Sequence, residues 1–139
     1  MSKISGPLLD RINLHIEVPG VKYADLASKV PGEASARIRQ RVIAAREIQL
    51  KRFADKKGMY KNADMQSKDL QQYCSLDPAG QDLLKMAISK LGLSARAYDR
   101  IQKVAGTIAD LAASENIRPE QISEAIRYRA LDHELWQKN

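Results

Sequence analysis

The stretch LGLSARAYDRIQKVAGTIADL, residues 91–111, decides the fold that we expect from this sequence. It opens with a glycine-containing turn, and Ser94 is placed to cap the helix that follows. Apolar residues then recur every three or four positions and build one stripe for a core: Ile101, Ala105, Ile108 and Ala112, widened by Ala97, Tyr98, Val104 and Leu111. The stretch therefore predicts a helix that packs against other helices.

Two arginines on the opposite face of this helix are unusual in their placement. Arg96 falls in the first turn, where the positive end of the helix dipole disfavours a cation, and Arg100 lies one turn further along the same face. A helix N-terminus with arginines suits a phosphate group. The alternative is a solvated arginine or one paired with a carboxylate such as Asp99, and residue types alone favour this alternative.

Most of the remaining chain also carries helical patterns. We expect a short turn at 23–28, a long helix at 33–53, and helices at 67–73, at 78–91 and from Pro119 to about Leu131. Asp77-Pro78 is a typical helix start and Gly92 a typical stop, whereas Ser67 is the expected cap of the helix at 67–73. Apolar residues on two sides of the long helix predict that it packs between two bodies, a sheet domain outside this sequence and the helices downstream.

Residues 12–18 have a different periodicity. Ile12, Leu14, Ile16 and Val18 alternate with polar residues, which is typical of a strand. No other segment of the chain alternates in this way, so we expect the strand to pair with a sheet that lies outside this sequence.

The composition is that of a globular domain, with 139 residues of which 29% are charged. Residues 1–61 carry 13 lysines and arginines against 6 aspartates and glutamates, a net charge of +7 within a total of +6. This basic part could face an acidic partner such as nucleic acid, although a solvated face is the more common explanation. We expect the lysine-rich stretch 54–66 to be a mobile loop, with contact to a nucleic-acid backbone as its functional alternative.

Complete catalytic motifs are missing from the sequence. It contains no G-x-x-x-x-G-K-[ST] phosphate loop, no H-E-x-x-H and no supported nucleophile–histidine pair, and Cys74 is the only cysteine. We therefore expect no metal site, no enzymatic activity of this chain alone and a core position for Cys74. No apolar run approaches the length of a membrane span, so we expect a cytoplasmic protein without membrane contact.

Several motifs together carry a family resemblance. SGPLLDRINLHIEVP, ARIRQRVIAAREIQLKRF and LGLSARAYDRIQKVAGTIADL followed by ENIRPEQISEAIRYR resemble the C-terminal part of magnesium-chelatase-like AAA+ ATPases, in particular the competence-related ComM/YifB group. The resemblance implies an all-α helical bundle, the AAA+ lid, over 21–139, and an N-terminal stub over 1–20 that bears the last strand of the ATPase core. It also implies ATP and Mg²⁺ as cofactors of the whole protein, and a homo-hexameric ring as its assembly.

The resemblance assigns roles to particular arginines. Arg11 matches the arginine finger, which reaches the nucleotide of a neighbouring subunit, and Arg96 matches the sensor-2 arginine, which contacts the nucleotide of its own subunit. Arg100 is a further candidate phosphate contact. Gly106 departs from the pattern, because family members usually have an arginine there.

We therefore expect the lid of an ATP-driven ring that handles DNA. Two alternatives stay open, a stand-alone basic helical DNA-binding domain and the lid of a motor that remodels a metal-insertion protein.

Overall fold

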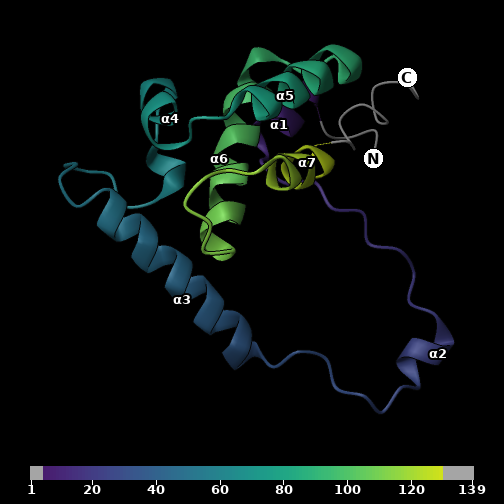
Figure 1. Ribbon diagram of the computed structural model, residues 1–139. Coiled ribbons are helices and arrows are strands. Elements are labelled where there is room, and N and C mark those ends of the chain that lie inside the picture. The colour runs from purple at the N-terminus through teal and green to yellow at the C-terminus, as the bar shows by residue number, and fades with distance from the viewer. Residues whose placement is uncertain (1–4, 130–139) are drawn as a thin grey trace.

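Every regular element among residues 5–129, the part of the chain that the computed structural model describes, is helical (Figure 1). The elements are α1 (Gly6–Arg11), α2 (Tyr23–Leu26), α3 (Ser35–Arg52), the 3₁₀ helix η1 (Asn62–Asp64), α4 (Ser67–Tyr73), α5 (Pro78–Leu91), α6 (Ala95–Leu111) and α7 (Pro119–Arg127). The predicted all-α helical fold is confirmed. Trp136 and the expected last turn to Leu131 lie outside the described residues.

Helix α6 is the centre of the bundle and contacts α3, η1, α4 and α7, while α5 packs on α7 (Figure 1). Its buried residues Ala97, Ile101, Ala105 and Ala109 face a core to which the other helices contribute Phe53, Met65, Leu70, Cys74, Leu76, Leu84, Ile117, Ile122 and Ala125. The predicted stripe is correct from Ala97 to Ile108 except at Tyr98, which is exposed. Leu111 and Ala112 are exposed at the C-terminal end of α6, where Leu111 is the last helical residue and Ala112 is the C-cap.

The ends of α5 follow the sequence signals. Asp77 accepts a hydrogen bond from the Gly80 N–H at 2.7 Å, which satisfies one free donor of the first turn. Gly92 adopts the left-handed conformation with φ 59° and ends the helix, as predicted. The predicted cap of α4 is wrong by one residue, because Gln66 is the N-cap and Ser67 is the first helical residue.

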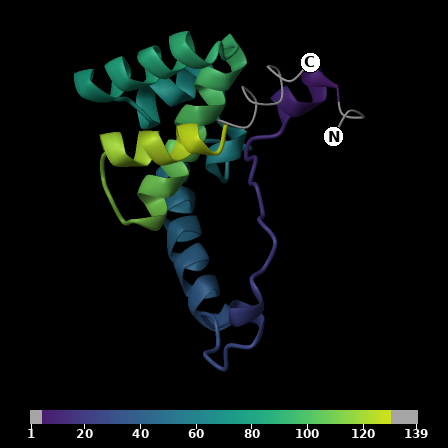
Figure 2. The same cartoon turned by 90° about the vertical axis from the view of Figure 1, so that its right-hand side faces the viewer.

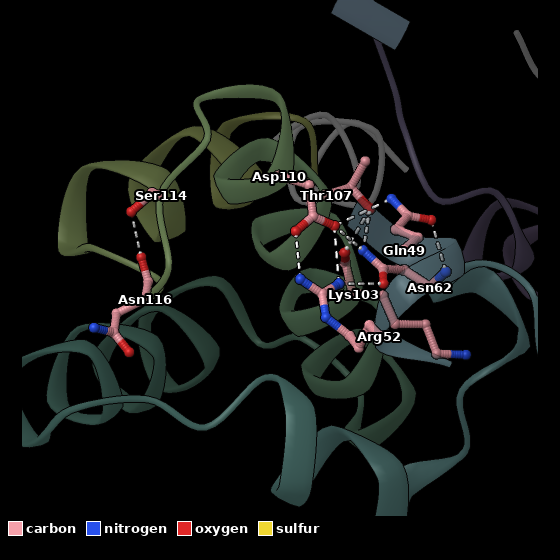
Figure 3. A network of polar contacts seen from close by, with 8 residues as sticks. All are labelled: Gln49, Arg52, Asn62, Lys103, Thr107, Asp110, Ser114 and Asn116. Carbon is pink, nitrogen blue, oxygen red and sulfur yellow. Dashed lines mark hydrogen bonds and ion pairs between the residues drawn. The ribbon is translucent and has the colours of Figure 1, made fainter. Parts of the chain in front are cut away.

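A buried polar network attaches α3 to α6 (Figure 3). The two Asp110 carboxylate oxygens accept hydrogen bonds from the Arg52 guanidinium at 2.5 and 3.0 Å, and the same carboxylate accepts from Gln49 at 3.1 Å and Asn62 at 2.8 Å. Asn62 also donates to the Thr107 hydroxyl at 3.1 Å. The Asp110 carboxylate raises the pKa of Arg52 by accepting its hydrogen bonds, so the Arg52 guanidinium stays charged.

Only the C-terminal half of α3 is attached in this way. Ala45 and Gln49 are buried, whereas Ile38, Val42 and Ile43 in the first half are 44–49% exposed. In both views this half runs away from the bundle, and α2 with its connecting segments loops still further out (Figures 1 and 2). The predicted contact of α3 with the downstream helices is found, and its packing against a sheet domain outside this sequence stays a prediction.

The predicted strand over residues 12–18 is not found, and no strand occurs anywhere in residues 5–129. A lone alternating segment has no neighbour to complete its backbone hydrogen bonds, so it runs as a connection between α1 and α2. Its beginning is held by the bundle, because the His15 N–H donates to the Tyr128 carbonyl at 2.8 Å. The division of the chain at residue 20 stays a prediction.

Gly106 has a packing role that the sequence did not reveal. A Cβ atom at this buried position would lie 2.8 Å from the Cys74 Sγ, which is closer than real contacts allow. No larger side chain, arginine included, can enter this space unless Cys74 moves. The close contact explains why this helix accepts a glycine that costs about 1 kcal/mol relative to alanine.

We expect Gly106→Ala to lower the free energy of unfolding by about 1 kcal/mol, because an overpacking cost of about 1–3 kcal/mol exceeds the gain in helix propensity. Cys74→Ala removes the clashing sulfur, so the double variant should recover about 1 kcal/mol relative to the sum of the single variants. Urea unfolding of the four proteins measures this coupling. Gly32→Ala is the control, since a Cβ there meets nothing within 4 Å. Additive single effects would contradict the packing role.

Candidate functional site

Arg96 lies in the first turn of α6 with an exposed side chain. The Ser94 hydroxyl accepts a hydrogen bond from the Ala97 N–H at 3.2 Å, so the predicted cap is confirmed. Within residues 5–129 no carboxylate pairs with Arg96, and Asp99 accepts a hydrogen bond from Ser67 at 2.6 Å instead. The Arg96 guanidinium is therefore open to an anion from outside this chain.

Arg11 is the last residue of α1 and is also exposed. Pro7 in the first turn favours the start of this short helix, and a cation in its last turn is favoured by the dipole. Its guanidinium has no ion-pair partner among the described residues. Both arginines that the family resemblance singles out thus point their charge at solvent.

The structure brings the segments of these two arginines together. The Ser94 hydroxyl donates to the Asp10 Oδ1 at 3.0 Å, which joins the end of α1 to the start of α6. Arg11 follows Asp10 directly, and Arg96 lies two residues after Ser94. The bond between Asp10 and Ser94 therefore holds the segment of Arg11 against the segment of Arg96 within one chain. In sequence, Asp10 and Ser94 are 84 positions apart.

Arg100 makes protein contacts beside this junction. Its Nη1 donates to the backbone carbonyl of Arg11 and, at 2.7 Å, to the side-chain oxygen of Asn13. Arg100 thus holds the chain that leaves α1 against the face of α6. A phosphate contact by Arg100 stays a prediction. The N–H groups of Arg100 other than those on Nη1 would have to make this contact.

Arg129 is the residue at this site that sequence reasoning missed. Its side chain is only 1% exposed, and its guanidinium donates to the Ile12 carbonyl and, at 3.3 Å, to the Asp10 Oδ1. A signal for its burial was present in the spacing, because Arg129 lies seven residues after Ile122, on the same side of the helix that the sequence predicts to run to about Leu131. What the sequence could not indicate is that the partners lie near the other end of the chain.

The remaining candidates contribute no second site. Cys74 is buried, and burial raises the pKa of its thiol to about 11, so it is protonated at neutral pH and a poor nucleophile. No group of three or more possible metal ligands comes together in the described part of the chain. None of its helices is long and apolar enough to cross a membrane.

The lysine-rich stretch 54–66 is more structured than predicted. It contains η1, and the Asp64 carboxylate accepts hydrogen bonds from the N–H groups of Tyr60 at 3.0 Å and Lys61 at 3.2 Å. The bond from Tyr60 is the main cause that lowers the pKa of Asp64. Asn62 and Met65 are buried, so the stretch is a fixed turn that presents an exposed Tyr60.

Comparisons with known proteins give a family match and several similar sequences. The family model "Magnesium chelatase, subunit ChlI C-terminal" matches residues 32–129. The chain is 42% identical to the protein YifB of Escherichia coli over 97% of its own length and 26% of that protein. It is also 42% identical to the competence protein ComM of Haemophilus influenzae over 94% of its length and 25% of ComM.

A mycobacterial relative, Rv2897c of Mycobacterium tuberculosis, is 32% identical over 93% of this chain and 25% of that protein. The chain spans about a quarter of the length of these curated relatives. The family match covers α3 to α7, and the ComM and YifB matches extend over nearly all of the sequence. The chain therefore belongs to the family of the C-terminal domain of the magnesium chelatase subunit ChlI.

Proposed function

We propose that this chain is the helical lid of a magnesium-chelatase-like AAA+ ATPase and supplies arginines to two nucleotide sites of a homo-hexameric ring. The observation that carries the proposal is the pair of exposed arginines, Arg11 and Arg96, at the two motif positions. An arginine whose role is to stabilise the fold would be paired with a carboxylate or buried, as Arg52 and Arg129 are.

Each arginine has a chemical task that suits its place. Arg96, on the first turn of α6, points a guanidinium where backbone N–H groups also favour an anion, so it fits the phosphates of ATP bound to the same subunit. Arg11 projects from the end of α1 and would contact the terminal phosphate bound by the next subunit. A guanidinium there stabilises charge on the transferring phosphoryl group, which is the chemistry of an arginine finger.

ATP and Mg²⁺ would be held mainly by residues outside this chain, because the sequence contains no phosphate loop. The chain supplies two positive charges and the helices that carry them. In this role the lid couples the nucleotide state of its own subunit, through Arg96, to the movement of the bundle.

The substrate of the motor is proposed from the relatives. ComM is named a competence protein, which favours handling of DNA. The basic first part of the chain supports the same partner, since Arg37, Arg39 and Arg46 lie exposed on α3. A stand-alone DNA-binding domain that uses this face is the second candidate, and a motor that acts on a metal-insertion protein is the third.

We expect the purified 139-residue chain to hydrolyse no ATP, and the whole ATPase that carries it to hydrolyse ATP with Mg²⁺. The physical reason is that two arginines without a phosphate loop can stabilise charge but cannot hold or orient ATP. A coupled phosphate-release assay on both proteins measures this difference. Turnover by the chain that survives repeated purification would contradict the proposal, and tight, salt-sensitive binding of DNA by the chain alone would favour the second candidate.

A further inference from the structure

The buried guanidinium of Arg129 ties the turn that follows α7 to the segment that carries Arg11. It donates to the Ile12 carbonyl and to the Asp10 Oδ1, so its two bonds lie on either side of Arg11 in sequence. A buried arginine costs free energy unless such partners compensate its charge. The end of α1 therefore supplies hydrogen-bond acceptors that compensate the buried charge of Arg129.

One carboxylate oxygen of α1 joins the start of α6 and the turn that follows α7. Asp10 Oδ1 accepts from the Ser94 hydroxyl at 3.0 Å and from Arg129 at 3.3 Å, so α1, the N-cap of α6 and the turn after α7 meet at a single atom. The Arg100 guanidinium adds a bond to the Arg11 carbonyl. We call these four residues, Asp10, Ser94, Arg100 and Arg129, the α1 clamp.

We propose that Arg129 is a positioning residue that, through the α1 clamp, fixes Arg11 relative to Arg96. The inference rests on the proposed function, in which these arginines serve two different nucleotide sites. Because charge-assisted hydrogen bonds have defined lengths and directions, a movement of the first turn of α6 is passed to Arg11. The clamp thereby connects the nucleotide that a subunit binds to the arginine that it offers to its neighbour.

The first test uses the 139-residue chain and needs no nucleotide. In Arg129→Lys the amide of His15, which donates to the Tyr128 carbonyl at 2.8 Å, should exchange with deuterium about ten-fold faster, the effect of losing one charge-assisted hydrogen bond. Amides at the α3–α6 network should keep their rates. Arg127→Lys makes the same change at an exposed position of α7. It should alter neither the exchange of the His15 amide nor that of the amides at the α3–α6 network.

Asp10→Ala is the second variant, since Asp10 is only partly buried and lies outside the apolar core. It should release the same amide. Unchanged His15 exchange in both variants would overturn the clamp, whereas faster exchange in both with an intact network supports it.

The second test measures ATP hydrolysis by the whole ATPase. Arg129→Lys should lower kcat by about 100-fold, the effect of a misplaced catalytic group, with little change in KM, because Arg96 still binds ATP. In a protein that already carries Arg11→Ala, Arg129→Lys should cause no further loss of kcat, because the side chain that it would misplace is absent. Additive losses would overturn the positioning role. If Arg11→Ala itself has no effect, the proposed function fails, and the exchange experiment alone decides whether the clamp exists.

Discussion

Rings assembled from equal amounts of Arg11→Ala and Arg96→Ala subunits are expected to hydrolyse ATP much faster than rings of either variant alone. Each variant alone should lose on the order of 10³-fold in kcat, because every site lacks one guanidinium at the transferring phosphoryl group. In a mixed ring, a site on an Arg11→Ala subunit keeps its own Arg96 and can receive Arg11 from an Arg96→Ala neighbour. Ring interfaces are head-to-tail, so with random mixing about one quarter of the sites are complete.

The measurement is the ATPase rate against the mixing ratio, with the melting temperature of each 139-residue variant alongside. Arg11→Ala mixed with the double variant is the control and should recover nothing, because no site can then have both arginines. Neither single variant should melt at a lower temperature, since both side chains are exposed. An Arg96→Ala ring with normal activity, or one whose subunits no longer fold, would disprove the sensor role.

The helices could be predicted because their signals are local. The spacing of Ile101 and Ala105, the Ser94 cap and the Gly92 stop each act within a few residues, and all are found in the structure. The predicted strand over 12–18 depended on a partner strand that the described residues do not contain. Local periodicity can indicate a strand but cannot supply its neighbour.

Local sequence patterns could not predict the long-range contacts at the candidate site. The family resemblance singled out Arg11 and Arg96, but it did not indicate that Asp10 and Ser94 join their segments. Arg129 and Asp10 are separated by 119 residues, and no local pattern pairs them. Arg52 likewise resembled the exposed arginines of α3 in sequence, and its pairing with Asp110 follows only from how α3 crosses α6.

Loss of this pairing should have the largest effect on stability, and we expect Asp110→Ala to lower the free energy of unfolding by about 3 kcal/mol. Breaking a buried ion pair by removing one partner costs about 3–5 kcal/mol, and the lower end applies because the Arg52 side chain is 21% exposed and can regain water. Gln49 and Asn62 lose the same acceptor. The melting temperature should fall by roughly 10 °C for a domain of this size.

Urea unfolding and amide exchange along α3 measure this effect, and the exchange should rise in the C-terminal half of α3, where the network holds it. Asp82→Ala is the matched control, because Asp82 is an exposed aspartate inside α5. Replacing Arg52 by Met together with Asp110→Ala removes both charges, so the double variant should be more stable than Asp110→Ala alone. If Asp110→Ala melts like Asp82→Ala, the network does not attach α3, and the apolar contacts of Ala45 and Phe53 with the core must hold this helix alone.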